Sequence, residues 1–202
     1  MDWPEILTTV TTSVLTGVAV WLRDRRKERL LRAVPIVASA HLQQEKVLNA
    51  LARELGAHQC LLLKAHNGGK IPHGGSTLKV TVVAEAEPPP GMARVRSEFQ
   101  ARPIDDSDYL RMLRDVDRQG FVLLKTEELK EGTMLGDEHR RAGIRSSWVM
   151  RVRAEPEQWY YLSCGSRHVM TPNAISRAVL RSTAAKLNHL CRPASRITTV
   201  DS

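Results

Sequence analysis

Four adjacent residues, His66, Asn67, Gly68 and Gly69, have the types and spacing that most strongly suggest a binding site. Imidazole and carboxamide groups donate and accept hydrogen bonds, and glycines let a ligand approach the backbone closely. The run opens the turn-rich segment 67–76 directly after an apolar stretch, so we expect a loop at the end of a strand, where binding residues often lie. An Asn-Gly pair is equally typical of a plain hairpin turn, and both interpretations stay open.

A second candidate site consists of Arg145, Arg151 and Arg153, with Arg167 nearby. Apolar and polar residues alternate over 144–153 as in a half-buried strand, so we expect the three arginines to share its outer face. A row of guanidinium groups is suited to contact phosphate or an acidic partner. A solvated strand face accounts for the same residues, since exposed arginine is common.

The other reactive residue types do not form a catalytic or metal-binding pattern. The histidines near the loop have no nearby carboxylate or second cysteine to complete a metal shell. Cys164 and His168 lack a third, orienting group, which favours a buried structural cysteine. Asp105, Asp106 and Asp108 precede a predicted helix, where such residues are routine caps. We therefore predict no enzymatic activity and no metal site, and the sequence identifies no cofactor.

The N-terminal segment 6–22 contains no charged residue and is just long enough to cross a bilayer. Trp3 and Trp21 lie about 27 Å apart along a helix, which suits one indole at each membrane interface. The basic residues that follow should stay in the cytoplasm. We expect a single-pass anchor in the inner (cytoplasmic) membrane with the domain in the cytoplasm. The basic interface residues are Arg23, Arg25 and Arg26.

An alternative for this segment is a helix that packs in a protein bundle. Five threonines and one serine lower its hydrophobicity. The helix would then bury its apolar face against other copies of the chain in a homo-oligomer. The two interpretations combine if several copies assemble through the threonine face within a membrane.

The composition excludes several classes of protein. Apolar residues make up 42% and charged residues 26% of the 202, which is typical of a globular chain and unlike a disordered or collagen-like one. The net charge of +8 favours anionic surfaces, but no nucleic-acid-binding motif is present, so we expect no sequence-specific nucleic acid binding. Three scattered cysteines fit a reducing compartment.

The chain divides into three predicted parts: the apolar helix and basic flank over 1–32, an α+β domain over 33–191 and a flexible tail over 192–202. Hydrophobic periodicity in the domain predicts an antiparallel sheet flanked by its first and last helices. The predicted helices are 35–56, 109–119 and 171–190, and the predicted strands are 58–66, 77–86, 121–125, 144–153 and 159–166, the first two of which should form a hairpin.

Four of the nine aromatic residues gather in one predicted strand pair. We expect them to supply much of the core, and some of them to line a pocket between the sheet and the loop. They are Trp148, Trp159, Tyr160 and Tyr161.

This order of elements resembles the GAF domain, a cousin of PAS, over residues 33–191. The resemblance depends on the first helix running into HQCLLLKAH, the strand pair GIRSSWVMRVRAEPEQWYYLSCGS and the closing helix TPNAISRAVLRSTAAKLNHL. The run AHNGG at 65–69 is also similar to an element of membrane-anchored GAF-like proteins, several of them phage-encoded. The resemblance implies a non-enzymatic sensor or adaptor that binds a small molecule or a cytoplasmic partner. The alternative is a structural component of a phage particle or membrane assembly that oligomerises through its N-terminal helix.

Overall fold

The computed structural model describes residues 22–25, 37–66, 78–104, 106–155, 158–171 and 173–191. Two compact units are present, and the unit His41–Arg192 contains the sheet and the helices that pack on it. Some predicted site residues lie outside the described residues, namely Trp3, Trp21, Arg26, Asn67, Gly68 and Gly69.

The centre of this unit is a six-stranded sheet with the order β3-β2-β1-β6-β5-β4, and every neighbouring pair is antiparallel. The five longer strands overlap the five that periodicity predicts, and the pairing of β1 with β2 confirms the predicted hairpin. β3 is too short to show a period in the sequence. The strands are β1 (Gln59–His66), β2 (Lys79–Glu85), β3 (Arg102–Pro103), β4 (Phe121–Lys125), β5 (Ser146–Glu155) and β6 (Gln158–Ser166).

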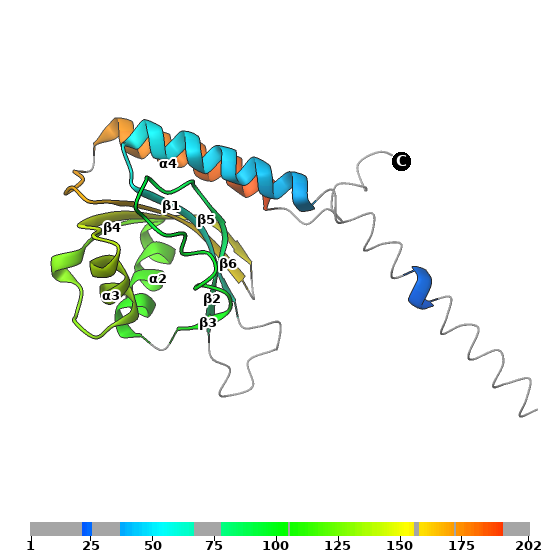
Figure 1. The fold of residues 1–202 in the computed structure, drawn as a ribbon, viewed down its shortest axis with the longest axis horizontal. Coiled ribbons are helices and arrows are strands. Elements are labelled where there is room, and N and C mark those ends of the chain that lie inside the picture. The colour runs from blue at the N-terminus through cyan, green and yellow to red at the C-terminus, as the bar shows by residue number, and fades with distance from the viewer. Residues whose placement is uncertain are drawn as a thin grey trace, which may run out of the picture. The chain divides into compact units, whose positions relative to one another are not determined.

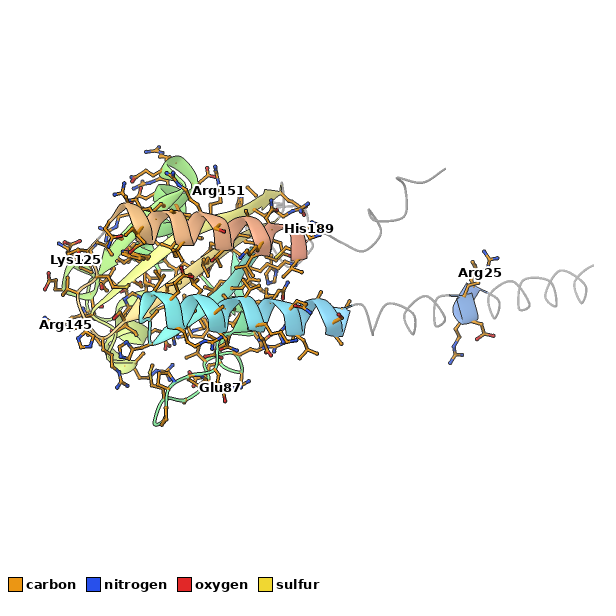
Figure 2. All side chains as sticks on the ribbon, turned by 90° about the horizontal axis from the view of Figure 1, so that it is seen from above. Arg25, Glu87, Lys125, Arg145, Arg151 and His189 are labelled. Carbon is orange, nitrogen blue, oxygen red and sulfur yellow. The ribbon has the colours of Figure 1, made fainter. Side chains whose placement is uncertain are left out.

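Two helices lie on one face of the sheet (Figure 1), the helical residues 37–55 and α4 (Ala174–Leu190), and they run side by side when seen from above (Figure 2). Leu48 and Leu51 of the first helix and Leu180 and Leu187 of α4 are almost fully buried in one core cluster with residues of the sheet. Leucines spaced three or seven residues apart fall on one side of a helix, which is why both helices bury a stripe against the strands. The fold is therefore α+β with flanking first and last helices, as predicted.

The opposite face of the sheet is covered by α2 (Ser107–Gln119), the short 3₁₀ helix η1 (Thr126–Glu128) and α3 (Met134–Arg141) (Figure 1). α2 begins after Asp106, whose carboxylate accepts hydrogen bonds from the first turn, and ends at Gly120 with a φ of 72°. Both caps agree with the sequence. α3 has eight mostly polar residues, so hydrophobic periodicity does not reveal it.

This second layer changes the environment of β5. Ser147 and Val149 lie on the side that alternation predicts to face solvent, but only 1% and 2% of their surface is exposed. Val149 packs in the core cluster that joins the sheet to α2 and α3. The prediction of a solvated outer face is therefore wrong for the middle of β5.

Candidate functional site

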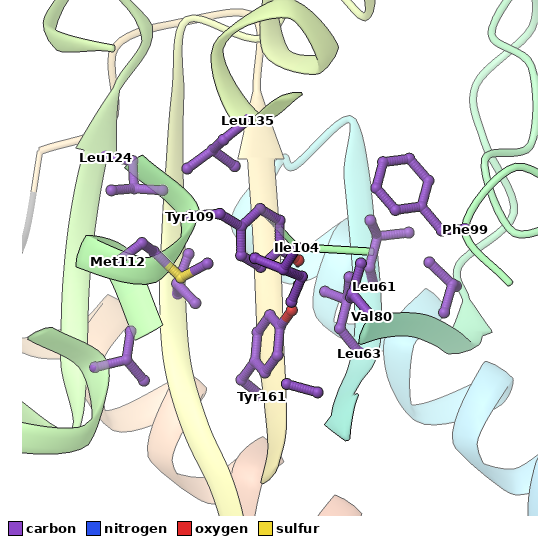
Figure 3. Close-up of a cluster of buried hydrophobic side chains, with 14 of the residues drawn as sticks. Leu61, Leu63, Val80, Phe99, Ile104, Tyr109, Met112, Leu124, Leu135 and Tyr161 are labelled. Atoms are coloured by element: carbon purple, nitrogen blue, oxygen red, sulfur yellow. The ribbon is translucent and has the colours of Figure 1, made fainter. Parts of the chain in front are cut away.

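A cavity of about 230 Å³ lies between the sheet and its layer of α2 and α3. The sheet contributes apolar side chains from the four adjacent strands β1, β6, β5 and β4, and α2, α3 and the segment 91–99 close the cavity. Figure 3 shows many of these side chains in the buried cluster around Tyr109 and Tyr161. The floor residues include Leu61, Leu63, Val149 and Tyr161, and the covering residues include Met92, Phe99, Tyr109, Met112 and Leu135.

The covering segment is attached to β2 by specific hydrogen bonds. The buried carboxylate of Glu85 accepts hydrogen bonds from the backbone amides of Val95 and Arg96, each at 3.1 Å. The amide of Val82 donates to the carbonyl of Phe99 at 2.8 Å. These bonds hold Val95 and Phe99 against the cavity, so this part of the wall is built into the fold.

Two buried aspartates hold α3 against the start of α2. Asp106 caps α2 through Oδ1, which accepts from the amide of Asp108 at 2.7 Å, while its Oδ2 accepts from the amide of Leu135 at 2.9 Å. Asp108 accepts from the amide of Lys130 at 2.8 Å and lies 3.2 Å from Arg111. Both carboxylates therefore act as structural clamps that position Leu135 in the cavity wall.

Tyr109 and Tyr161 meet at the cavity with their hydroxyl groups hydrogen-bonded to each other (Figure 3). Their rings lie edge to face with centroids 6.5 Å apart. Burial raises the pKa of both hydroxyls well above the ordinary value, so both are protonated at neutral pH. Two hydroxyls carry two protons, and their mutual bond uses one. The second proton has no acceptor among the described residues, which leaves one buried donor for a ligand.

His139, on α3, also lines the cavity, but its hydrogen bonds make it a structural residue. Its Nδ1 and Nε2 each lie 3.2 Å from a hydroxyl, that of Thr126 and that of Ser147. Thr126 donates its own proton to the carbonyl of Ile144, so Nδ1 must donate to Thr126 and Nε2 must accept from Ser147. Burial lowers the pKa of His139 to about 4, so the ring is neutral at pH 7.

Ion pairs connect α3 to Glu98 and Arg102, which precede α2 in the chain. Glu138 pairs with Arg102 at 2.7 Å and with Arg141, and Arg141 also pairs with Glu98 at 2.5 Å. Each of these four charges therefore has a counter-charge within the protein. Among the described residues of the wall, His139 and the two tyrosines have pKa values shifted away from neutrality, so none of the three is suited to exchange protons at pH 7.

Solved structures share this arrangement of sheet and helices. A far-red cyanobacteriochrome photoreceptor matches with a TM-score of 0.58 and 11% identity, over 83% of this chain and 93% of that chain. The GAF domain region of a putative membrane protein from Geobacter sulfurreducens PCA matches with a TM-score of 0.53 and 15% identity, over 79% and 97%. The fold is GAF-like.

The GAF-like fold occurs in proteins with different activities. A type II free methionine-R-sulfoxide reductase from Thermoplasma acidophilum matches with a TM-score of 0.50 and 15% identity, over 77% of this chain and 94% of that chain. No protein-family model and no curated protein matches the sequence. Identities this low show the fold and leave the activity to be argued from the site.

His66 lies at the end of β1 in the GAF-like domain, away from the cavity wall. Leu63 and Ala65 belong to the cavity-side core, so alternation directs His66 to the opposite face of the sheet. Its Nε2 lies 3.0 Å from the Thr81 hydroxyl. Burial, and then the charges of Lys64 and Lys79, lower its pKa. The ligand-contacting role predicted for His66 and for Asn67, Gly68 and Gly69 stays a prediction.

The three predicted arginines do not lie together. Arg145 precedes β5, and Arg151 lies just past the middle of the strand, well separated from Arg145 in Figure 2. A bulge pairs Arg151 with Tyr161 but Arg153 with Tyr160, which shifts Arg153 out of regular alternation. Arg151 pairs with Asp117 at 3.0 Å, and Arg153 pairs with Glu155. The three arginines therefore do not form one continuous row on the strand, and their role as phosphate or partner contacts stays a prediction.

The residues around the predicted anchor are described only in part. Residues 22–25 are helical and expose Arg23 and Arg25. Within the described ranges, no helix combines the length and apolar character that crossing a membrane requires. The predicted span 6–22 lies outside these ranges except for Leu22.

Most of the cavity leaves no pattern in the sequence. Tyr161 belongs to the aromatic strand pair for which we predict a pocket between the sheet and the loop 67–76, but the cavity that it lines is a different one, under α2 and α3. Trp148 packs under the helices on the other face. Tyr109 lies 52 residues before Tyr161 and shows only as part of an amphipathic helix. A tyrosine on the apolar face of a helix or strand indicates a buried hydroxyl that needs a hydrogen-bond partner. No local pattern in the sequence shows that Tyr109 and Tyr161 are partners.

Proposed function

We propose that this chain is a non-enzymatic GAF-like sensor module that binds a small molecule in the cavity between the sheet and α2. The observation that carries the proposal is an apolar cavity on whose wall a buried tyrosine pair keeps one hydroxyl proton for which the described residues offer no acceptor. Apolar pockets with a few convergent polar groups are the usual form of small-molecule sites. The photoreceptor among the structural neighbours supports a sensory role by analogy.

The chemistry of the wall supports binding over catalysis. His139 is neutral with both nitrogens hydrogen-bonded, both tyrosines hold their protons, and the charges of Glu98, Glu138 and Arg141 are paired. Of the described residues that line the cavity, none is a cysteine. The reductase among the neighbours shows that the fold itself is compatible with an enzyme, so the proposal depends on this wall.

A screen of metabolites and nucleotides by thermal shift tests the proposal. A ligand at about 100 times its Kd should raise the melting temperature by roughly 5 to 10 °C. Leu135→Phe fills the cavity and should abolish this shift. Leu129→Phe is the matched control, because Leu129 is buried in the same core cluster but does not line the cavity. A broad library that shifts neither wild type nor control would overturn the proposal.

We also propose that residues 6–22 attach this module to the inner membrane, with the domain in the cytoplasm. The support is the uncharged run and the basic residues that follow it. Full-length protein should sediment with membranes and resist carbonate extraction, and deletion of residues 1–32 should release it. Full-length protein that stays soluble without detergent or lipid would contradict the anchor and favour a helical bundle of several copies.

A further inference from the structure

Arg167 carries the one formal charge on the cavity wall that has no counter-charge among the described residues. Arg141, on the same wall, is paired with Glu98 and with Glu138. Glu138 is also paired with Arg102. The lining holds two carboxylates and two guanidinium groups, and Arg102, which lies outside the lining, completes a neutral cluster with Glu98, Glu138 and Arg141. The exposed guanidinium of Arg167 is therefore left without an ion pair in the described part of the chain.

The strand register places neutral hydrogen-bonding groups at the same end of the cavity. Gln59 of β1 pairs with Gly165 of β6, two residues before Arg167, and the next position of β6 on this face is Ser163. The side chains of Gln59 and Ser163 both line the cavity, and neither has a hydrogen-bond partner in the described parts of the chain. A guanidinium, an amide and a hydroxyl together can all donate to one oxyanion.

The rest of the wall is mostly apolar and limits the size of a ligand. Leu61, Leu63, Met112, Leu124 and Val149 line its central part. A cavity of about 150 Å³ is enough to hold benzene. A cavity of about 230 Å³ therefore has room for one ring or a short branched chain and a small head group.

We infer that the ligand is a small organic acid, with one carboxylate bound by Arg167 and an apolar body in the centre of the cavity. This inference rests on the function proposed above. A carboxylate brings a single negative charge, which matches the single unpaired guanidinium, and it fits the two-pronged geometry of arginine. A phosphate monoester carries a charge of about −1.5 to −2, more than this wall neutralises.

Titration calorimetry on the full-length protein tests the inference with matched probes. Phenylacetate and hexanoate share their apolar bodies with phenylacetamide and hexanamide, and only the acids are charged. The acids should bind at least tenfold more tightly than the amides, since a hydrogen bond to a charged group typically contributes that much. Arg167→Gln should remove the difference. Arg118→Gln removes the same charge from an exposed position on α2 that does not line the cavity, and should preserve it.

Three results would overturn the inference. Equal affinity of acids and amides for the wild type would show that the cavity does not select an anion. Loss of acid selectivity in Arg118→Gln would show a general effect of surface charge. Failure of both acids to bind would exclude the proposed ligand class. In each case a library ligand whose thermal shift is lost in Leu135→Phe would still support the cavity as a binding site, so the two proposals fail separately.

Discussion

Asp106→Ala is expected to lower the free energy of unfolding by roughly 2 to 5 kcal/mol. Loss of a helix N-cap costs about 1–2 kcal/mol, and a buried amide left without an acceptor adds about 1–3 kcal/mol. Asp106 supplies both functions, because it caps α2 and accepts from the amide of Leu135 on α3. Chemical denaturation monitored by circular dichroism measures the change.

Asp115→Ala is the control for this prediction. Asp115 also lies on α2, but its partner is the exposed Arg114 at 3.5 Å, so its loss should change the free energy of unfolding by no more than about 0.5 kcal/mol. Asp106→Asn should fall between the two, since asparagine caps a helix well. Similar stabilities for Asp106→Ala and Asp115→Ala would contradict the clamp.

Acidification from pH 7 to pH 4 is expected to destabilise the protein through His139. The pKa of this histidine is about 4 in the folded state and 6.5 in the unfolded chain. The unfolded state therefore binds the proton first, so stability is unaffected above about pH 6.5, falls between about pH 6.5 and pH 4, and levels off below that. The difference between the two pKa values corresponds to roughly 3 kcal/mol.

His139→Gln isolates this contribution from other titrating groups. Glutamine can donate to Thr126 and accept from Ser147, as the neutral imidazole does, but it does not titrate. Between pH 7 and pH 4 the variant should lose roughly 3 kcal/mol less stability than the wild type. His189→Gln, at an exposed position on α4, controls for removal of a histidine. Parallel stability curves for wild type and His139→Gln would show that burial of His139 is not the cause.

Interactions within a few residues were readable from the sequence. Alternating or three-to-four-residue spacing of apolar side chains located five strands, the helix before them, α2 and α4, but not α3. Asp106 and Gly120 marked the ends of α2, because a cap acts on the backbone within one turn. The α+β class and the resemblance to GAF domains followed from the order of these elements.

Only the tertiary structure decided where the candidate site lies. Alternation divides the residues of β5 between two faces of the sheet, but it does not show whether other elements cover both faces. α2 and α3 bury the face that alternation predicts to be exposed to solvent. A bulge between Arg151 and Arg153 shifts Arg153 out of the regular alternation of the strand, and the sequence pattern does not reveal this bulge. The hydrogen bond between Tyr109 and Tyr161 joins segments far apart in the chain, and so does the cavity wall in which Arg167 lies without an ion pair among the described residues. Local spacing does not encode such contacts. The sequence by itself thus determined the elements and their caps, whereas packing of the second layer on the sheet determined the cavity and its charge.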